Sequence, residues 1–310
     1  MKREIIETNS ESEWLALRDS DITSTMSAAL FDLSPWLTKF ELYHAKKSGV
    51  QVPFVANERM NDGLSLEPYA AAKVAADMGW THHKITGYAR LPELRMGSSF
   101  DYLVCGEDGK EGILELKAVD YRKLKTDWLD DEAPPHIEIQ VQHQMECLDK
   151  DWCAIVAFHS IYDYRMIIRE RDREMGAAIC DAVKMFWRWV ENSNEPSPDY
   201  FRDSAVINAL YKPEGELLDY TADAELNALL SKYSRLNDEE KQVEKEAKAT
   251  KAEIFAMLQN SAGGYTEDFR VTSKMTKPYE GKLITEDMVG TRIGARDGYR
   301  NLTVKAMRKE

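Results

Sequence analysis

The chain has 310 residues, with 41 Lys and Arg against 54 Asp and Glu, for a formal net charge of −13. Its 43% hydrophobic and 31% charged residues are typical of a globular protein and exclude a disordered chain. The acidic balance argues against a surface that binds nucleic acid everywhere, although it permits a local basic groove. The apolar runs, such as residues 154–158, are too short to cross a bilayer.

Residues 1–4 lead into a polar stretch that lacks the apolar core of a signal peptide. The four cysteines form no C-x-x-C pair, which disfavours a structural zinc site or an iron–sulfur cluster. We therefore expect reduced thiols that mostly fill the core of a cytoplasmic protein with no membrane partner.

Residues 1–192 read as one domain in which helices surround strands. Helical periodicity and turn residues predict helices over 11–18, 24–33, 36–47, 57–79, 135–148 and 172–191. Alternating apolar residues predict strands over 85–89, 99–105, 112–119, 154–160 and 164–169. This order predicts an α/β fold with a small mixed sheet flanked by helices.

A composition break at Asn192–Pro198 predicts a linker to an accessory domain over residues 199–310. Residues 224–258 carry a long apolar stripe, and Asn237 with Glu240 is spaced to cap a second helix. We therefore expect a helical hairpin or coiled coil there, followed by strands over 269–273 and 298–304. Basic residues outnumber acidic ones only in residues 260–310.

Charged residues on one predicted hairpin carry the chemistry. Strand alternation sends Leu114 and Leu116 to the core face and Glu115 and Lys117 to the opposite face. The hairpin can bring Asp101 beside Glu115, and upstream of it Glu67 lies on a helix that could cover the same cleft. Such carboxylates repel one another unless a cation neutralises them, and oxygen ligands select Mg²⁺ or Mn²⁺.

By itself, the D-x13-E-x-K spacing is more typical of a solvated strand face than of a nuclease. Other motifs occur in the same order, however: Trp14–Arg18 with Ile22–Thr25, Gly63–Pro68, Ser99–Asp101, Leu114–Lys117, Ile139–Met145 and Ile168–Asp172. Over residues 11–190 the sequence resembles the lambda-exonuclease-like family, also called YqaJ-like viral recombinases, of the PD-(D/E)XK nuclease superfamily.

The resemblance implies a 5′-to-3′ exonuclease that acts on double-stranded DNA, releases 5′-mononucleotides and leaves a 3′ single strand for recombination by annealing. It also implies one or two Mg²⁺ or Mn²⁺ ions, a ring-shaped homotrimer, and a single-strand annealing protein as partner. The matched motifs assign metal binding to Asp101, Glu115, Glu67 and the Leu116 carbonyl.

The resemblance further implies that Lys117 positions and activates the nucleophile, with Gln140 bounding the metal site. It assigns the terminal 5′-phosphate to Arg18, Thr25, Ser99 and a basic residue for which Arg122 and Lys123 both fit. His136 shares a helical face with Gln140 at the i, i+4 spacing, which makes it the histidine to test near the site.

Some positions depart from the family pattern. Phe100 and Tyr102 stand where proline and glycine usually flank the aspartate, and Ile137 stands where a tyrosine is common. None of these changes removes a ligand. Two alternatives stay open: another PD-(D/E)XK nuclease, either single-strand-specific or endonucleolytic, and an inactive DNA-end-binding recombination scaffold. For the exonuclease and for the alternative nuclease alike, we expect a narrow basic track that leads to Glu115.

Overall fold

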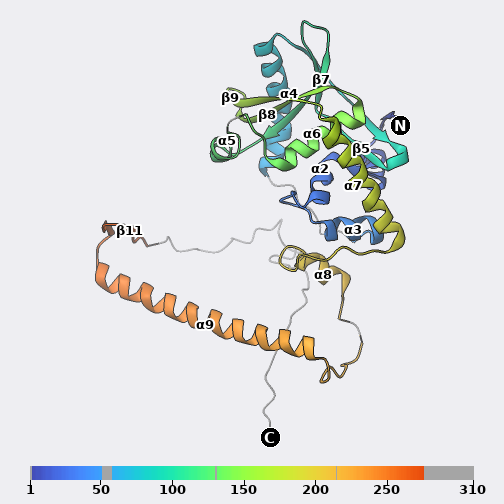
Figure 1. Cartoon of the computed structure of the whole chain (residues 1–310). Helices are drawn as coiled ribbons and strands as arrows, with labels where there is room; N and C mark the ends of the chain where they lie inside the picture. The colour runs from blue at the N-terminus through green and yellow to red at the C-terminus, as the bar shows by residue number, and fades with distance from the viewer. Residues whose placement is uncertain (1, 51–57, 130, 214, 276–310) are drawn as a thin grey trace, which may run out of the picture. The chain divides into compact units, whose positions relative to one another are not determined.

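The computed structural model describes residues 2–50, 58–129, 131–213 and 215–275 (Figure 1). The chain divides into two compact units, the first ending at Tyr211 and the second beginning at Lys212. None of the helices in these ranges is long and apolar enough to span a membrane.

A five-stranded mixed sheet forms the centre of the first unit. In spatial order its strands are β3 (Thr81–Lys84), β6 (Tyr102–Cys105), β7 (Glu111–Ala118), β8 (Trp152–Ser160) and β9 (Asp163–Glu170). Only β7 and β8 run parallel, and the other neighbours are antiparallel. The mixed sheet predicted from the sequence is therefore confirmed.

Helices cover both faces of this sheet (Figure 1). On one face, α4 (Glu58–Met78) packs small residues against the inward side chains of the strands, including Leu114 and Leu116. A Cβ added at Gly63 would lie 2.8 Å from the Ala118 Cβ. Glycine at this position therefore lets α4 approach the end of β7 closely.

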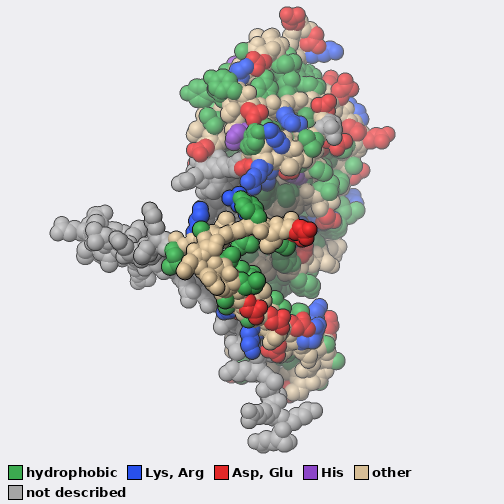
Figure 2. All heavy atoms as spheres, turned by 90° about the vertical axis from the view of Figure 1, so that its left-hand side faces the viewer, with side chains coloured by type: hydrophobic (Ala, Val, Ile, Leu, Met, Phe, Trp, Pro, Cys, Tyr) green, Lys and Arg blue, Asp and Glu red, His purple; other side chains and the backbone are tan. Residues whose placement is uncertain are grey.

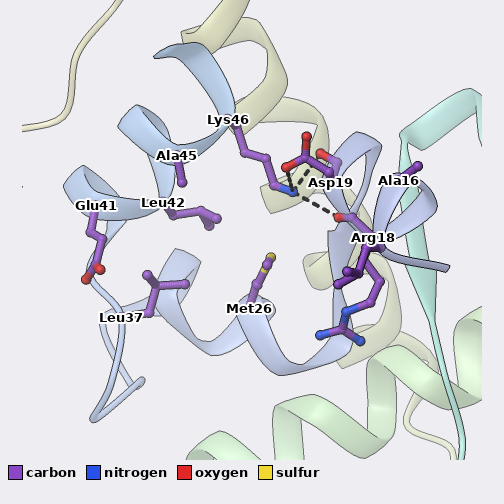
Figure 3. Close-up of a pocket in the computed structure, with 10 residues that line it drawn as sticks. Ala16, Arg18, Asp19, Met26, Leu37, Glu41, Leu42, Ala45 and Lys46 are labelled. Carbon is purple, nitrogen blue, oxygen red and sulfur yellow. Dashed lines mark hydrogen bonds and ion pairs between the residues drawn. The ribbon is translucent and has the colours of Figure 1, made fainter. Parts of the chain in front are cut away.

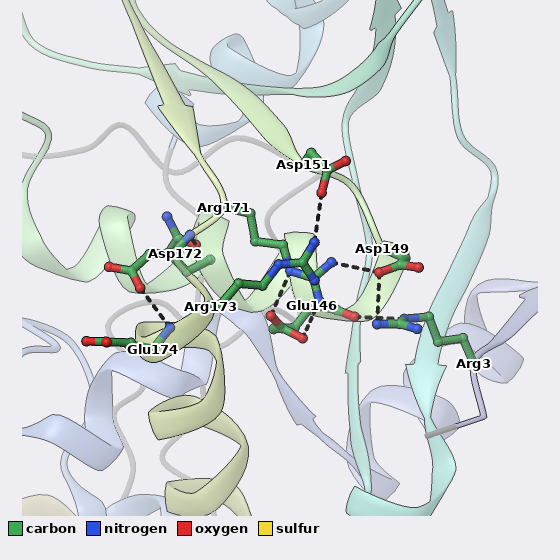
Figure 4. A network of polar contacts seen from close by, with 9 residues as sticks. Arg3, Glu146, Asp149, Asp151, Arg171, Asp172, Arg173 and Glu174 are labelled. Carbon is green, nitrogen blue, oxygen red and sulfur yellow. Dashed lines mark hydrogen bonds and ion pairs between the residues drawn. The ribbon is translucent and has the colours of Figure 1, made fainter.

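The opposite face packs against α6 (Pro135–Leu148) and, beyond it, α7 (Arg173–Asn192). Arg171, in the turn between β9 and α7, is only 3% exposed and donates to both carboxylate oxygens of Glu146, at 2.7 and 2.6 Å (Figure 4). The same guanidinium donates to Asp149 at 2.7 Å. This network fixes the carboxyl end of α6 against the sheet.

A second, four-stranded sheet carries the N-terminal part of the chain. Its strands, in spatial order, are β1 (Glu4–Glu7), β4 (Gly87–Leu91), β5 (Met96–Ser98) and β2 (Ile22–Thr23). The adjoining helices are α1 (Glu11–Ser20), α2 (Ser24–Ser27), η1 (Ala28–Phe31), α3 (Lys39–Ser48) and η2 (Pro92–Leu94). The helix predicted over 24–33 is thus an α-turn followed by a 3₁₀ turn.

The first unit extends past the predicted linker. After α7, Glu195 lies 3.3 Å from His44, and the buried Asp203 accepts a 2.5 Å hydrogen bond from Thr38. Helix α8 (Ser204–Leu210) follows and buries Val206. These contacts attach residues 195–206 to the N-terminal helices.

The second unit is dominated by α9 (Ala224–Leu258), a continuous helix of 35 residues with none buried. The predicted hairpin is therefore wrong for these residues. No Gly or Pro interrupts 224–258, and i, i+4 ion pairs such as Arg235–Glu239 support an unbroken helix. Strands β10 (Gly263–Tyr265) and β11 (Arg270–Thr272) then pair, which confirms the strand predicted at 269–273. The one predicted at 298–304 lies outside the described residues.

Candidate nuclease site

The β6–β7 hairpin brings Asp101 next to Glu115. Tyr102 pairs with Leu114 in the antiparallel register, so Asp101 lies just before β6 and level with the middle of β7. The Asp101 Oδ2 accepts a 2.8 Å hydrogen bond from the backbone N–H of Leu116. This bond fixes the carboxylate at the point where the chain enters the hairpin.

Glu115 is buried, and three side-chain donors surround its carboxylate. Oε1 accepts from Lys117 Nζ at 2.5 Å and from Gln140 Nε2 at 2.7 Å, while Oε2 accepts from Gln144 Nε2 at 2.7 Å. Both glutamines come from α6, one turn apart. Gln144 was missed in the sequence, although its i, i+4 spacing from Gln140 placed both amides on one helix face.

The charges of this cluster are strongly coupled. Burial raises the pKa of the Asp101 carboxyl, and the neighbouring charge of Glu115 raises it further, whereas Lys117 and the Leu116 N–H act in the opposite direction. Burial disfavours the charge of Lys117, yet Glu115 and Asp101 raise the pKa of its ammonium above the usual value. Lys117 is therefore a hydrogen-bond donor in this state and not a proton acceptor.

Glu67, on α4, approaches the same place from the other side of the hairpin. Its charge contributes to the raised pKa of Asp101, but its Oε1 accepts a 3.1 Å hydrogen bond from Lys84 Nζ. Within the described ranges, no three His, Cys, Asp or Glu side chains form a ready metal-binding group. The carboxylates predicted to bind metal are thus neighbours, each engaged by a donor from the protein.

Two of the residues predicted to bind phosphate, Arg18 and Ser99, contact Trp14. Its indole N–H donates to Ser99 Oγ at 2.8 Å, and the Arg18 guanidinium stacks 4.5 Å from its ring. Thr25 Oγ1 lies 3.1 Å from Thr23 Oγ1. The structure therefore brings Arg18 and Ser99 together through Trp14, a residue to which the sequence reasoning gave no role of its own.

The guanidinium of Arg18, a half-buried residue, has no carboxylate partner in the described part of the chain. Burial lowers the pKa of its guanidinium, yet no ion pair or hydrogen bond joins this group to any residue in the described ranges. A half-buried cation without a carboxylate partner is expected to bind an anion.

A pocket of about 480 Å³ opens beside Arg18 (Figure 3). It lies between α1 and α3, and its lining is largely apolar. Lys46 borders it and donates to the backbone carbonyls of Arg18 and Asp19 at 3.0 and 2.7 Å. Burial lowers the pKa of Lys46 to about 8. This lysine therefore anchors the end of α1 that carries Arg18.

Two lysines of the predicted basic track lie near His136. The pKa of His136 is lowered by burial and by the charges of Lys117 and Lys123, so both lysines lie near it. Lys123, on α5 (Tyr121–Thr126), is exposed and lies 5.9 Å from the ring of Trp36. No contact within the described ranges joins Arg122 to Arg18 or Ser99. On the face shown in Figure 2, basic side chains lie among acidic ones.

The four cysteines are free thiols, and Cys153 lies near Glu115 on the neighbouring strand β8. Cys147, Cys153 and Cys180 are buried free thiols, and Cys105 is a partly buried one. Burial raises the pKa of Cys147, Cys153 and Cys180. The expectation of reduced cysteines that fill the core is confirmed.

Comparison with known proteins concerns the family and the fold of the chain. Residues 13–151 match the family model of the YqaJ-like viral recombinase domain, so the resemblance found in the sequence is confirmed for this part of the chain. The chain is similar to the uncharacterized protein YqaJ of Bacillus subtilis strain 168, with 29% identity over 194 residues. The matched region covers 60% of this chain and 59% of that protein.

Among solved structures, the chain resembles LHK-Exo in complex with dAMP, with 25% identity and a TM-score of 0.50 over 63% of this chain and 98% of that chain. A second structure, of an alkaline exonuclease (LHK-Exo) from Laribacter hongkongensis, also has 25% identity and the same coverage, with a TM-score of 0.48. The predicted fold class, an α/β core of the PD-(D/E)XK kind, is thereby confirmed.

Proposed function

We propose that this protein is a metal-dependent 5′-to-3′ exonuclease that acts on double-stranded DNA and leaves a 3′ single strand for recombination by annealing. The Gln144 amide carries the proposal, because it joins two groups of residues. Its Nε2 lies 2.7 Å from Glu115 Oε2 and 3.3 Å from the Ser99 carbonyl. This contact supports a single site in which the acidic cluster lies next to the residues proposed to bind phosphate.

The donor set fits a hard divalent cation. Asp101, Glu115 and Glu67 offer carboxylate oxygens and Leu116 offers a backbone carbonyl, which suits Mg²⁺ or Mn²⁺. One or two such ions, when bound, would stabilise the attacking water and the leaving oxygen of phosphodiester cleavage. Gln140 and Gln144 hold the Glu115 carboxylate in one orientation, since each donates to one of its oxygens.

Lys117 then acts mainly by positioning. Because Glu115 and Asp101 raise the pKa of its ammonium, Lys117 donates hydrogen bonds to the nucleophilic water or to the developing negative charge on the phosphate. The ion pair with Glu115, at 2.5 Å, holds it at the site before substrate arrives.

The phosphate end sets the polarity of digestion. Arg18 offers a planar guanidinium to a terminal 5′-phosphate, with the hydroxyls of Ser99 and Thr25 as further donors. Arg122 or Lys123 completes this set. A 5′-phosphate bound there would place the next phosphodiester near Asp101 and Glu115, so that one nucleotide would be removed at a time.

Assembly and partners belong to the same proposal. A ring of three copies would enclose the DNA, and a single-strand annealing protein would take up the 3′ strand. The second unit, from Lys212, is proposed as the accessory part that contacts DNA, a neighbouring subunit or that partner.

The test is digestion of four DNA substrates with Mg²⁺ or Mn²⁺. A 5′-phosphorylated linear duplex should release 5′-mononucleotides, whereas dephosphorylated, nicked and circular duplexes should be degraded at least about tenfold more slowly. Equal rates with and without the 5′-phosphate would contradict the assigned phosphate site. Cleavage of circular DNA would indicate an endonuclease, and the absence of any digestion would indicate a DNA-end-binding scaffold.

A further inference from the structure

Lys84 ends the edge strand β3, beside the candidate metal site. It pairs in register with Tyr102, the residue that follows Asp101. Its Nζ lies 3.1 Å from Glu67 Oε1 and 5.5 Å from the centre of the Tyr102 ring. All four residues of β3 are exposed, so DNA can approach this lysine from the open edge of the sheet.

Two lysines form ion pairs with two of the three carboxylates of the site. Lys117 pairs with Glu115, Lys84 pairs with Glu67, and Asp101 accepts from the Leu116 N–H. The two pairs differ in burial. The Lys117 side chain is 24% exposed and Glu115 4%, whereas Lys84 is 56% exposed. A partly exposed ion pair changes an equilibrium by no more than about fivefold, so Glu67 and Lys84 can exchange partners readily.

A divalent cation that binds Glu67 takes over the role of Lys84 as its counter-charge. The released ammonium then lies on a flexible, mostly exposed stem within reach of the scissile region. Two neighbouring cations repel each other unless an anion lies between them. A DNA phosphate is an anion that this site is expected to receive.

We propose that Lys84 is a DNA-phosphate ligand that Glu67 retains until a divalent metal binds, so that metal binding adds one protein–phosphate contact. This inference rests on the proposed nuclease function. It adds a residue outside the matched motifs and predicts that the role of Lys84 depends on metal. Glu67 keeps Lys84 occupied in the metal-free protein and prevents it from contributing there.

The experiment measures binding of the full chain to a 5′-phosphorylated duplex over a range of salt concentrations, with either EDTA or Ca²⁺. Absence of released nucleotides is checked in the Ca²⁺ samples. Each phosphate contact contributes about 0.9 to the slope of log K against log salt. In Ca²⁺, Lys84→Gln should lower this slope by about 0.9 and weaken binding roughly threefold to tenfold at 0.1 M salt. In EDTA, the variant should match the native protein.

The matched control is Lys73→Gln. Lys73 also pairs with a carboxylate, that of Asp77 one turn along α4, and with none of the three acidic residues of the site. This variant should leave both slopes unchanged. Calorimetry with Ca²⁺ alone gives a readout without DNA: Lys84→Gln should bind the ion as tightly as the native protein or up to about fivefold more tightly.

An unchanged slope for Lys84→Gln in Ca²⁺, an equal loss in EDTA, or weaker Ca²⁺ binding would each overturn the role of Lys84. If one of these results were found while the native protein still bound duplex ends and digested them, only the role of Lys84 would be wrong, and the proposed nuclease function would stand. If the native protein bound no duplex end in Ca²⁺, the proposed function would fail together with it.

Discussion

The two ends of the candidate site differ in how their charges are satisfied. At the acidic end, Glu115 accepts three hydrogen bonds, and Glu67 and Asp101 each have a donor. At the phosphate end, the Arg18 guanidinium stacks on Trp14 without a hydrogen-bonded or ionic partner among the described residues. The carboxylates are thus neutralised by donors of the protein, whereas the Arg18 guanidinium has no such partner among the described residues. Such a site is suited to bind an anion at Arg18 first, and a metal ion only as it replaces the donors of the carboxylates.

Removal of Lys117 should have the largest effect. Lys117→Ala should reduce the rate of cleavage by about 10³-fold, because a preorganised donor near the reacting phosphate is worth roughly 3–4 kcal/mol. Single-turnover digestion with Mg²⁺ measures this. The control is Lys150→Ala, which removes a similarly exposed lysine that pairs with Glu111 at the start of β7. Cleavage that survives Lys117→Ala would contradict the assigned mechanism.

The second prediction concerns His143, which connects α6 to the N-terminal elements α2 and β5. It is fully buried, lies 2.5 Å from Ser27 Oγ through Nδ1 and 3.0 Å from the Gly97 carbonyl through Nε2. Since the carbonyl only accepts, Nε2 carries the proton and Nδ1 accepts from Ser27. The imidazole thereby ties α2 and β5 to α6.

Burial lowers the pKa of His143 to about 3, from 6.5 when unfolded. Between these values the unfolded chain binds more protons, so stability falls as the pH drops below about 6.5. From pH 7 to pH 4 the loss should approach about 3 kcal/mol. Chemical denaturation of the native protein and of His143→Gln over this range measures the difference. The interpretation would be abandoned if both lost stability equally.

Arg18→Ala should abolish the preference for phosphorylated ends. The loss of two charge-assisted hydrogen bonds should reduce the ratio of rates on 5′-phosphate and 5′-hydroxyl duplexes by about 100-fold. Arg18→Lys, which keeps the charge but not the planar fork, should recover only part of it. A ratio unchanged in Arg18→Ala would show that the 5′-phosphate binds elsewhere.

Gln144→Ala should have the smallest effect of the four. One oxygen of Glu115 would lose its donor, at a cost of about 1–2 kcal/mol, and cleavage should slow by about tenfold. The control is Gln142→Ala on the same helix, since that amide bonds to Glu170 and Asp172 instead. Equal slowing by both substitutions would indicate a general effect on α6.

Local patterns were enough to predict the elements that carry the site. Alternation along residues 112–119 separates Leu114 and Leu116 from Glu115 and Lys117, and the structure has the first pair packed against α4. Pro134-Pro135 marks the start of α6. These features depend on residues close together in sequence, so the chain alone displays them.

The partners of each charge depended on tertiary structure. Lys84 reaches Glu67 only because β3 joins the sheet beside β6, and Trp14 reaches Ser99 only because the N-terminal helices pack on the second sheet. Such contacts join residues 17 to 85 positions apart, and no local periodicity encodes them.

The sequence by itself determined the strand carrying Glu115 and Lys117, the helix carrying Gln140, and the mixed α/β composition of the core. Each of these follows from side-chain alternation or helical spacing, which are properties of neighbouring residues. The continuity of α9 is also a local property, since no Gly or Pro interrupts residues 224–258 and none of the helix is buried. Tertiary structure decided that Lys117 and Lys84 pair with two of the three carboxylates and that Arg18 stays unpaired among the described residues, because pairing of charges depends on distances that only the folded chain fixes.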